Sequence, residues 1–116
     1  MALVLCTGSD ESLMQTRKLI LEQAGHQVIL ASNLIAVEQA CAKHDFQVIV
    51  LGHTLVSPEK RRLAGFVRRV CKTAKILELL RPGQSTKSVP DADDWLEVPV
   101  GDPAELATRV TALAAK

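Results

Sequence analysis

The run Phe46-Gln47-Val48-Ile49-Val50-Leu51, which ends at Gly52, decides the fold. Its nearly continuous apolar and β-branched character is typical of a strand buried on both faces, as in a parallel sheet covered by helices. Four further short apolar runs have a similar character and occupy residues 2–6, 27–31, 76–80 and 95–98. We therefore expect a sheet of five strands.

The segments between the first three runs predict helices. Residues 10–24 begin with acidic residues and end before Gly25, a residue that favours helix termination. The apolar positions that share one face of this helix are Leu13, Ile20, Leu21 and Ala24. Ser32 and Asn33 offer capping side chains for a second helix that runs to about residue 43.

Two more helices are indicated by start signals. Ser57-Pro58-Glu59 combines a capping residue, a first-turn proline and an early acid, and predicts a helix to about residue 72. Asp102-Pro103-Ala104-Glu105 has the same order and predicts the last helix. Residues 81–94 are rich in Pro, Gly, Ser, Lys and Asp without apolar periodicity, which favours a loop with at most one turn of helix.

Strands that alternate with helices and connect by short right-handed crossovers predict an α/β fold, a doubly wound parallel sheet of flavodoxin-like order 2-1-3-4-5. We expect one domain over residues 1–116, with the helix between the fourth and fifth strands shortened or missing. In such sheets the ligand crevice lies at the carboxyl ends of strands one and three. Here that crevice would fall between residues 8–10 and 52–55.

Composition narrows the class of protein. The chain is 47% hydrophobic but only 3% aromatic, so Val, Ile, Leu and Ala must build the core. A net charge of +1 gives no general attraction to nucleic acid or to an acidic membrane. Cys6, Cys41 and Cys71 lack the spacing of a metal site and fit buried thiols in a reducing cytosol. With no leader and no membrane-spanning stretch in the sequence, we expect a soluble, cytoplasmic protein.

Four segments together resemble a known family. Gly25-His26-Gln27-Val28, Asp45 to Leu51, Trp95 to Val100 and Asp102 to Leu106 are similar, in order and spacing, to the receiver (CheY-like) domain of bacterial response regulators. The resemblance extends over essentially the whole chain. It implies the flavodoxin-like fold and a place in two-component signal transduction or a phosphorelay.

The resemblance also implies that the phosphorylation chemistry of receivers is lost. Receivers hold Mg²⁺ with two acidic residues and an acceptor aspartate, and contact the phosphoryl group with a hydroxyl residue and a lysine. At the matching positions this chain carries Gly8 and Ser9, Gly52, Leu79 or Leu80, and Val98. We therefore expect an atypical, degenerate receiver that is not an enzyme, with no catalytic residue, metal or cofactor.

Two further positions follow from the resemblance. Pro99 matches a proline that receivers place after a cis peptide bond, so we expect a cis bond between Val98 and Pro99. Trp95 matches the switch aromatic, whose coupling to phosphorylation should be absent here. Packing at the edge of the last strand and binding of a partner remain equally open roles for Trp95.

The remaining polar residues suggest weaker hypotheses. His53 and Asp10 could anchor a small anion across the crevice, against the plainer interpretation that both are simply polar loop residues. His26 and His44 lie at element ends and are expected to face solvent. Glu78 interrupts an apolar strand, so we expect it at a strand end or paired with a base such as Arg81.

The third predicted helix is strongly basic. Its candidate interaction patch consists of Arg61, Arg62, Arg68 and Arg69, flanked by Lys60 and Lys72. A solvated outer face is the leading interpretation; an acidic protein is favoured over nucleic acid as a partner because the sequence has no helix-turn-helix signature.

Three functions remain open at this point. The first is a stand-alone pseudo-receiver that acts by phosphorylation-independent protein–protein interaction, alone or as a homodimer. The second is a small-ligand or anion sensor that uses the vacated crevice around Gly8, Ser9, Asp10, Gly52 and His53. The third is a working receiver with a relocated acceptor. The motifs of nucleotide-binding, hydrolase and metal-dependent enzymes are missing from the sequence.

Overall fold

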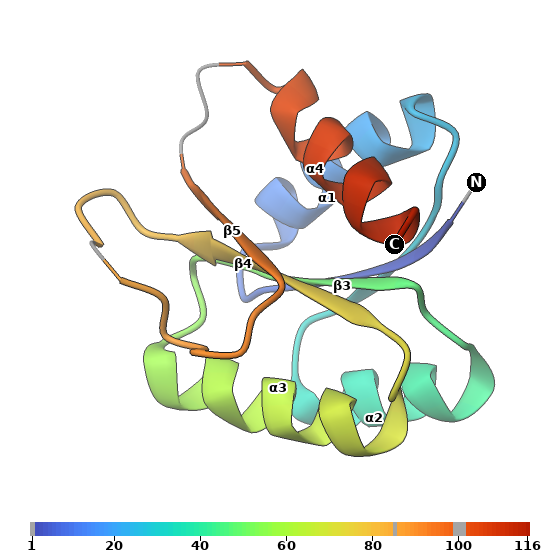
Figure 1. The fold of residues 1–116 in the computed structure, drawn as a ribbon, viewed down its shortest axis with the longest axis vertical. Helices are drawn as coiled ribbons and strands as arrows, with labels where there is room; N and C mark the ends of the chain where they lie inside the picture. The colour runs from blue at the N-terminus through green and yellow to red at the C-terminus, as the bar shows by residue number, and fades with distance from the viewer. Residues whose placement is uncertain (1, 85, 99–101) are drawn as a thin grey trace.

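The computed structural model describes residues 2–84, 86–98 and 102–116 and contains a parallel sheet between two layers of helices (Figure 1). The strands are β1 (Leu3–Thr7), β2 (Gln27–Ala31), β3 (Val48–Leu51), β4 (Lys75–Leu80) and β5 (Asp94–Glu97). The helices are α1 (Glu11–Gln23), α2 (Leu34–Lys43), α3 (Ser57–Val70) and α4 (Ala104–Ala114).

The sheet has the order β2-β1-β3-β4-β5, and all of its strand pairs are parallel. β1 and β3 lie side by side in the centre, with Thr7 opposite Leu51 at their carboxyl ends. This arrangement confirms the doubly wound, flavodoxin-like architecture predicted from the sequence. It also places the segments that follow β1 and β3 at the same edge of the sheet.

Each face of the sheet has its own apolar core. Helices α1 and α4 cover one face, and helices α2 and α3 cover the other (Figure 1). Side chains alternate between the two faces along each strand. In β4, Leu77 and Leu79 therefore pack under α1 and α4, whereas Ile76 packs under α2 and α3. Glu78, between Leu77 and Leu79, occupies the same face as Ile76.

The helix boundaries follow the predicted caps with one exception. Asp10 caps α1 by accepting the Leu13 N–H at 3.1 Å, and Asn33 caps α2 by accepting the Ala36 N–H at 2.8 Å. Ser57 was predicted as the cap of α3, but it is the first helical residue and follows the N-cap Val56. Its hydroxyl is bonded instead to Ser88 at 2.7 Å.

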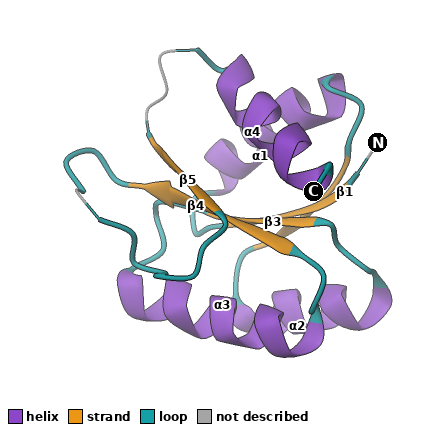
Figure 2. Cartoon of the chain, viewed as in Figure 1, coloured by secondary structure: helices purple, strands orange, loops and turns teal. Residues whose placement is uncertain are grey.

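The connection between β4 and β5 contains turns and bends, and its described residues form no helix (Figure 2). The described part of this connection agrees with the prediction that the helix between the fourth and fifth strands is shortened or missing. Two corrections concern other residues. Ala24 was placed on the buried face of α1, but it is exposed at the C-cap.

His26 was expected in solvent, but it is buried between the N-terminal strand and α4. Its Nδ1 accepts the Ala2 N–H at 3.2 Å, so Nε2 carries the proton and is bonded to the Thr111 hydroxyl at 2.9 Å. His44, the other histidine expected in solvent, is exposed. The burial of His26 thus ties the start of the chain to its last helix.

Candidate functional site

The carboxyl ends of β1 and β3 meet at two glycines. The Gly52 N–H donates to the Thr7 carbonyl at 2.9 Å, and a Cβ at position 52 would lie 2.4 Å from that same oxygen and 3.2 Å from the Gly8 Cα. A Cβ atom essentially never lies 2.4 Å from an oxygen, and the Thr7 oxygen cannot swing aside because it belongs to the backbone. Position 52, the predicted place of a lost acceptor, is therefore closed to every residue except glycine.

The other side of the predicted crevice is occupied by local hydrogen bonds. The Ser9 N–H donates to the Thr54 hydroxyl at 3.0 Å. The Asp10 carboxylate caps α1 through the Leu13 N–H, which satisfies it within its own helix turn. Asp10 also acts electrostatically on His53 and on Arg17, so the two predicted anchors lie near each other, and no hydrogen bond joins them among the described contacts.

His53 contacts a residue that the sequence analysis did not single out. Arg17 Nη2 donates to His53 Nδ1 at 2.9 Å, so the neutral imidazole carries its proton on Nε2. Burial, followed by the nearby cations Arg17, Lys60 and Arg81, lowers the pKa of His53. The segment after β3 thus lies in a positively charged environment, with His53 in its neutral form.

Arg17 is a buried cation on the inner face of α1. Arg17 is only 8% exposed, and its guanidinium forms no ion pair with any carboxylate that the structure describes. Burial lowers its pKa, and Cys6 and Asp10 offset that effect only in part. The Cys6 thiol does not act as a counter-ion, because burial raises its pKa to about 12.

The sequence held a signal for Arg17. It lies four residues after Leu13 and four before Leu21, in the middle of the apolar face of α1. A basic residue at such a position must either extend to solvent or stay buried with a partner. Periodicity alone cannot separate these outcomes, because the partner His53 is 36 positions away in the chain.

A cavity of about 330 Å³ lies between α1 and α4, over the carboxyl ends of β4 and β5. Its walls are mainly apolar and include Leu13, Ile20, Leu79, Leu96, Val98 and Leu106. Arg17, His53 and Thr16 supply its polar side chains. Among the described residues of the predicted pocket, His53 and Val98 line this cavity, as does Leu79, the alternative to Leu80 for the hydroxyl position.

The hydroxyl and lysine positions inferred from the resemblance are filled by hydrocarbon. Leu80 ends β4 and is buried, and the Val98 N–H donates to its carbonyl at 3.0 Å. Val98 itself is buried and packs in the core under α1 and α4. Pro99 and the expected cis bond before it lie outside the described residues.

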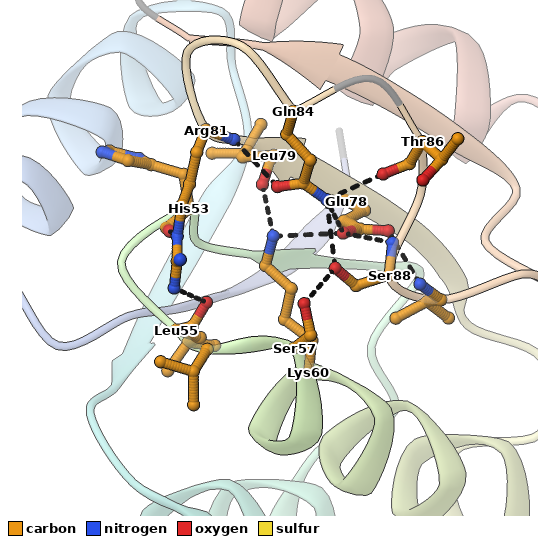
Figure 3. Close-up of polar contacts among 12 residues, drawn as sticks. His53, Leu55, Ser57, Lys60, Glu78, Leu79, Arg81, Gln84, Thr86 and Ser88 are labelled. Atoms are coloured by element: carbon orange, nitrogen blue, oxygen red, sulfur yellow. Dashed lines mark hydrogen bonds and ion pairs between the residues drawn. The ribbon is translucent and has the colours of Figure 1, made fainter.

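On the opposite face of the sheet, Glu78 forms a buried ion pair. Lys60 Nζ donates to the Glu78 carboxylate at 3.1 Å and to the Leu79 carbonyl at 2.8 Å, and both charged side chains are essentially inaccessible to solvent (Figure 3). The backbone N–H groups of Ser88 and Val89 each donate to the carboxylate at 3.0 Å. We call these five residues, with Gln84, the Glu78 network.

The Glu78 network has a clear electrostatic consequence. Burial by itself raises the pKa of the Glu78 carboxyl, but the N–H groups of Val89 and Ser88 and the Lys60 ammonium outweigh burial and hold it below its ordinary value. The carboxylate is therefore ionised and fully satisfied. Of the two predicted alternatives, pairing with a base is confirmed, but the base is Lys60. Arg81, the example given in the prediction, donates instead to the carbonyls of His53 and Leu55.

The basic face of α3 is smaller than predicted. Lys60 points inward to Glu78, and Arg68 is bound to Asp91 and Asp93 at 3.1 and 3.0 Å. Arg68 also donates to the Ala74 carbonyl, just before β4, and its bonds to Asp91 and Asp93 hold the end of the β4–β5 connection beside that point. The arginines of the patch that remain exposed are Arg61, Arg62 and Arg69.

Trp95 lies on the edge strand β5 and is 48% exposed. Lys87 Nζ lies 4.7 Å from the centre of its ring, a cation–π geometry. The indole therefore packs against the β4–β5 connection.

Comparison with solved structures identifies the fold. A candidate response regulator from Chloroflexus aurantiacus matches with a TM-score of 0.85 at 24% identity, over 99% of this chain and 98% of that chain. A two-component response regulator from Clostridium difficile matches with a TM-score of 0.84 at 21% identity, over 100% of this chain and 98% of that chain. A CheY-like receiver domain protein from Methanospirillum hungatei matches with a TM-score of 0.82 at 17% identity, over 99% of this chain and 94% of that chain.

This chain has the receiver fold. The likeness holds over nearly the full length of each compared chain, which agrees with the strand order and with the sequence resemblance. No protein-family model and no curated protein matches the sequence. Shared architecture at such low identity leaves function to be argued from the site itself.

The described residues contain neither a membrane-spanning helix nor a metal-binding group. No helix among them has the length and apolar character needed to cross a bilayer. No group of three or more His, Cys, Asp or Glu side chains within residues 2–84, 86–98 and 102–116 has the geometry to hold a metal ion.

Proposed function

We propose that this chain is a receiver-like signalling module that acts through phosphorylation-independent protein–protein interaction. The observation that carries the proposal is the backbone contact at Gly52. A Cβ there would lie 2.4 Å from the Thr7 carbonyl oxygen, so an acceptor carboxylate has no space at the end of β3. The fold supports a signalling role, and the closed acceptor position argues against a phosphorylated one.

The charges around this position support the same conclusion. Receiver chemistry needs acidic ligands that concentrate Mg²⁺. Here Arg17, Lys60 and Arg81 act on His53, and the one nearby acid, Asp10, caps α1. A divalent cation would meet repulsion at this edge of the sheet, whereas an anion would meet attraction.

Intact-mass analysis tests the first half of the proposal. The protein is incubated with Mg²⁺ and acetyl phosphate, beside a receiver that retains its acceptor aspartate as the positive control. We expect no phosphoryl adduct on this chain under conditions that fully modify the control. An adduct would overturn the proposal, and peptide mapping at Ser9, Asp10 and His53 would then locate the relocated acceptor.

The exposed arginines of α3 form the surface that we propose for an acidic protein partner. Arg61, Arg62 and Arg69 have no ion-pair partner among the described carboxylates, so their charge is available. Such surfaces speed association and select partners by charge. A homodimer would need another surface, because like-charged faces repel each other.

Charge reversal tests this surface. In-cell crosslinking is carried out with the wild type and with the Arg61→Glu/Arg62→Glu/Arg69→Glu variant. Lys18→Glu, on α1 across the sheet, is the control. We expect an acidic partner to be recovered with the wild type and the control but not with the triple variant. Equal recovery with all three proteins would contradict the assignment.

A further inference from the structure

The cavity between α1 and α4 is lined by a largely buried cation that forms no ion pair with a described carboxylate. Arg17 lines the cavity and is only 8% exposed. Its Nη2 donates to His53, and no buried side-chain nitrogen among the described residues lacks a partner, so any guanidinium nitrogen without a partner is open to solvent. Elsewhere in the same chain the buried cation Lys60 is paired with Glu78. Arg17 is thus the exception within a protein that otherwise neutralises its buried charge.

Such an arrangement suits an anion that arrives from outside. A buried charge is costly unless it is paired, so a negatively charged ligand would gain more from Arg17 than from an exposed arginine. The planar guanidinium matches the two oxygens of a carboxylate. The nearby His53 is neutral, and its protonated Nε2 offers a further donor.

We propose that this cavity binds a small organic monocarboxylate with an apolar body, whose carboxylate pairs with Arg17. The body would occupy the space between Leu13 and Ile20 of α1 and Leu106 of α4. A volume of about 330 Å³ is at the lower end of ligand pockets, which suits an aryl or branched alkyl acid.

The wall chemistry selects a carboxylate over a phosphate. Apart from Arg17, His53 and Thr16, the side chains that line the cavity are hydrocarbon. A phosphate has more oxygens and more charge than these three groups can satisfy. An acid with one charged end and an apolar remainder matches both parts of the lining.

This site differs from the crevice considered in the sequence analysis. Gly8 and Gly52 close that crevice by backbone contact, and neither lines the cavity. The site is also independent of the proposed function, because it needs neither the arginine surface of α3 nor a partner protein.

Titration with matched probes tests the proposal. Phenylacetate, its neutral analogue phenylacetamide, and inorganic phosphate are each titrated into the full chain, with amide chemical shifts and calorimetry as readouts. We expect phenylacetate to bind with a dissociation constant of about 1 mM or tighter. Shifts should concentrate at Leu13, Arg17, Leu96 and Leu106. Phenylacetamide and phosphate should bind at least about tenfold more weakly.

Three variants separate the parts of the site. Arg17→Met keeps the apolar stem and should weaken phenylacetate about 10- to 100-fold without changing the affinity for phenylacetamide. Leu13→Trp fills the cavity from a half-buried position and should weaken both probes. Lys43→Met, at the exposed end of α2 on the opposite side of the sheet, is the control and should bind as the wild type does. Circular dichroism and thermal unfolding establish that each variant is folded.

Several results would overturn the proposal. They are unchanged phenylacetate affinity in folded Arg17→Met, equal affinity for phenylacetate and phosphate in the wild type, and shifts that lie outside the cavity. Absence of binding by phenylacetate and by longer aryl acids at millimolar concentration would also overturn it. None of these results bears on phosphorylation, so failure here leaves the proposed function standing.

Discussion

At Gly52 the missing side chain allows two strands to meet. The N–H of Gly52 bonds to the Thr7 carbonyl, and the Cα of Gly8 lies beside it. The backbone angle of Gly52 is ordinary, so the requirement for glycine is one of space rather than of conformation. That distinction allows a sharp test by single substitutions.

We predict that Gly52→Ala lowers the free energy of unfolding by about 1–3 kcal/mol, because the methyl group must displace the backbone of β1 or β3. Gly52→Asp should destabilise at least as much and should not gain a phosphoryl adduct. Urea unfolding measures the free energies.

Gly65 provides the matched control for this prediction. It lies within α3, and a Cβ there would meet no atom within 4 Å. Gly65→Ala should therefore raise the free energy of unfolding by about 0.5–1 kcal/mol. If Gly52→Ala were as stable as the wild type, the closed contact between β1 and β3 would be incorrect.

At the scale of elements, the Glu78 network holds the connection between β4 and β5, whose described residues form no helix. The carboxylate reaches the backbone N–H groups of Ser88 and Val89, which have no helical partners. The Ser57 hydroxyl joins the start of α3 to Ser88. A connection without regular structure is thus fixed to the sheet by one buried acid.

We predict that Lys60→Met destabilises the protein by about 3–5 kcal/mol, since it leaves the Glu78 carboxylate buried without its cation. The amides of Ser88 and Val89 should also exchange with solvent faster, because the carboxylate that holds them becomes less stable. Urea unfolding and hydrogen exchange provide the two measurements.

Lys72→Met, at an exposed site just after α3, is the control and should change stability by no more than about 0.5 kcal/mol. Equal stability of the Lys60→Met variant and this control would show that the buried pair does not hold the connection.

The elements could be predicted from the sequence because their signals are local. Apolar periodicity and caps such as Asp10 and Asn33 lie within or beside the segments that they define. The errors at Ser57 and His26 have another origin. Their side chains bond to Ser88 and Thr111, which are 31 and 85 positions away. Local patterns carry no information about such partners.

The same limit applies to the site. The resemblance placed Gly52, Leu80 and Val98 at the carboxyl edge of the sheet, and the structure finds them there. It could not indicate that Arg17 would face His53 or that Lys60 would face Glu78. A sequence shows that a charge lies on an apolar face, but only packing shows whether that charge has a partner.

For the whole molecule, buried titratable groups determine the response to pH. Burial lowers the pKa of His26 in the folded protein. At a pH between the folded and the unfolded pKa of His26, the imidazole is therefore protonated in the unfolded chain but neutral in the folded one. Stability is then complete above the unfolded pKa, about 6.5, and falls as pH decreases. At still lower pH, protonation of Glu78 causes a second loss of stability. The pKa of Glu78 is depressed in the folded protein, and its stabilising charge disappears when it is protonated.

We predict that the free energy of unfolding falls from pH 7 to pH 5, by up to about 1.4 kcal/mol per pH unit for each buried histidine that titrates. His26→Gln should reduce this slope, because it removes one of the two histidines with a lowered pKa; His53 is the other. Urea unfolding at several pH values between 7 and 5 measures this slope.

His44→Gln, at the exposed end of α2, is the control and should retain the wild-type slope. A slope that is the same in the wild type and in His26→Gln would exclude the buried, neutral state of His26.

The contact at Gly52 also bears on how sequences with this fold can change over time. An aspartate codon lies one base change from a glycine codon. That change at position 52 would set a Cβ 2.4 Å from the Thr7 carbonyl oxygen. The contact therefore obstructs the gain of an acceptor carboxylate by a single base change.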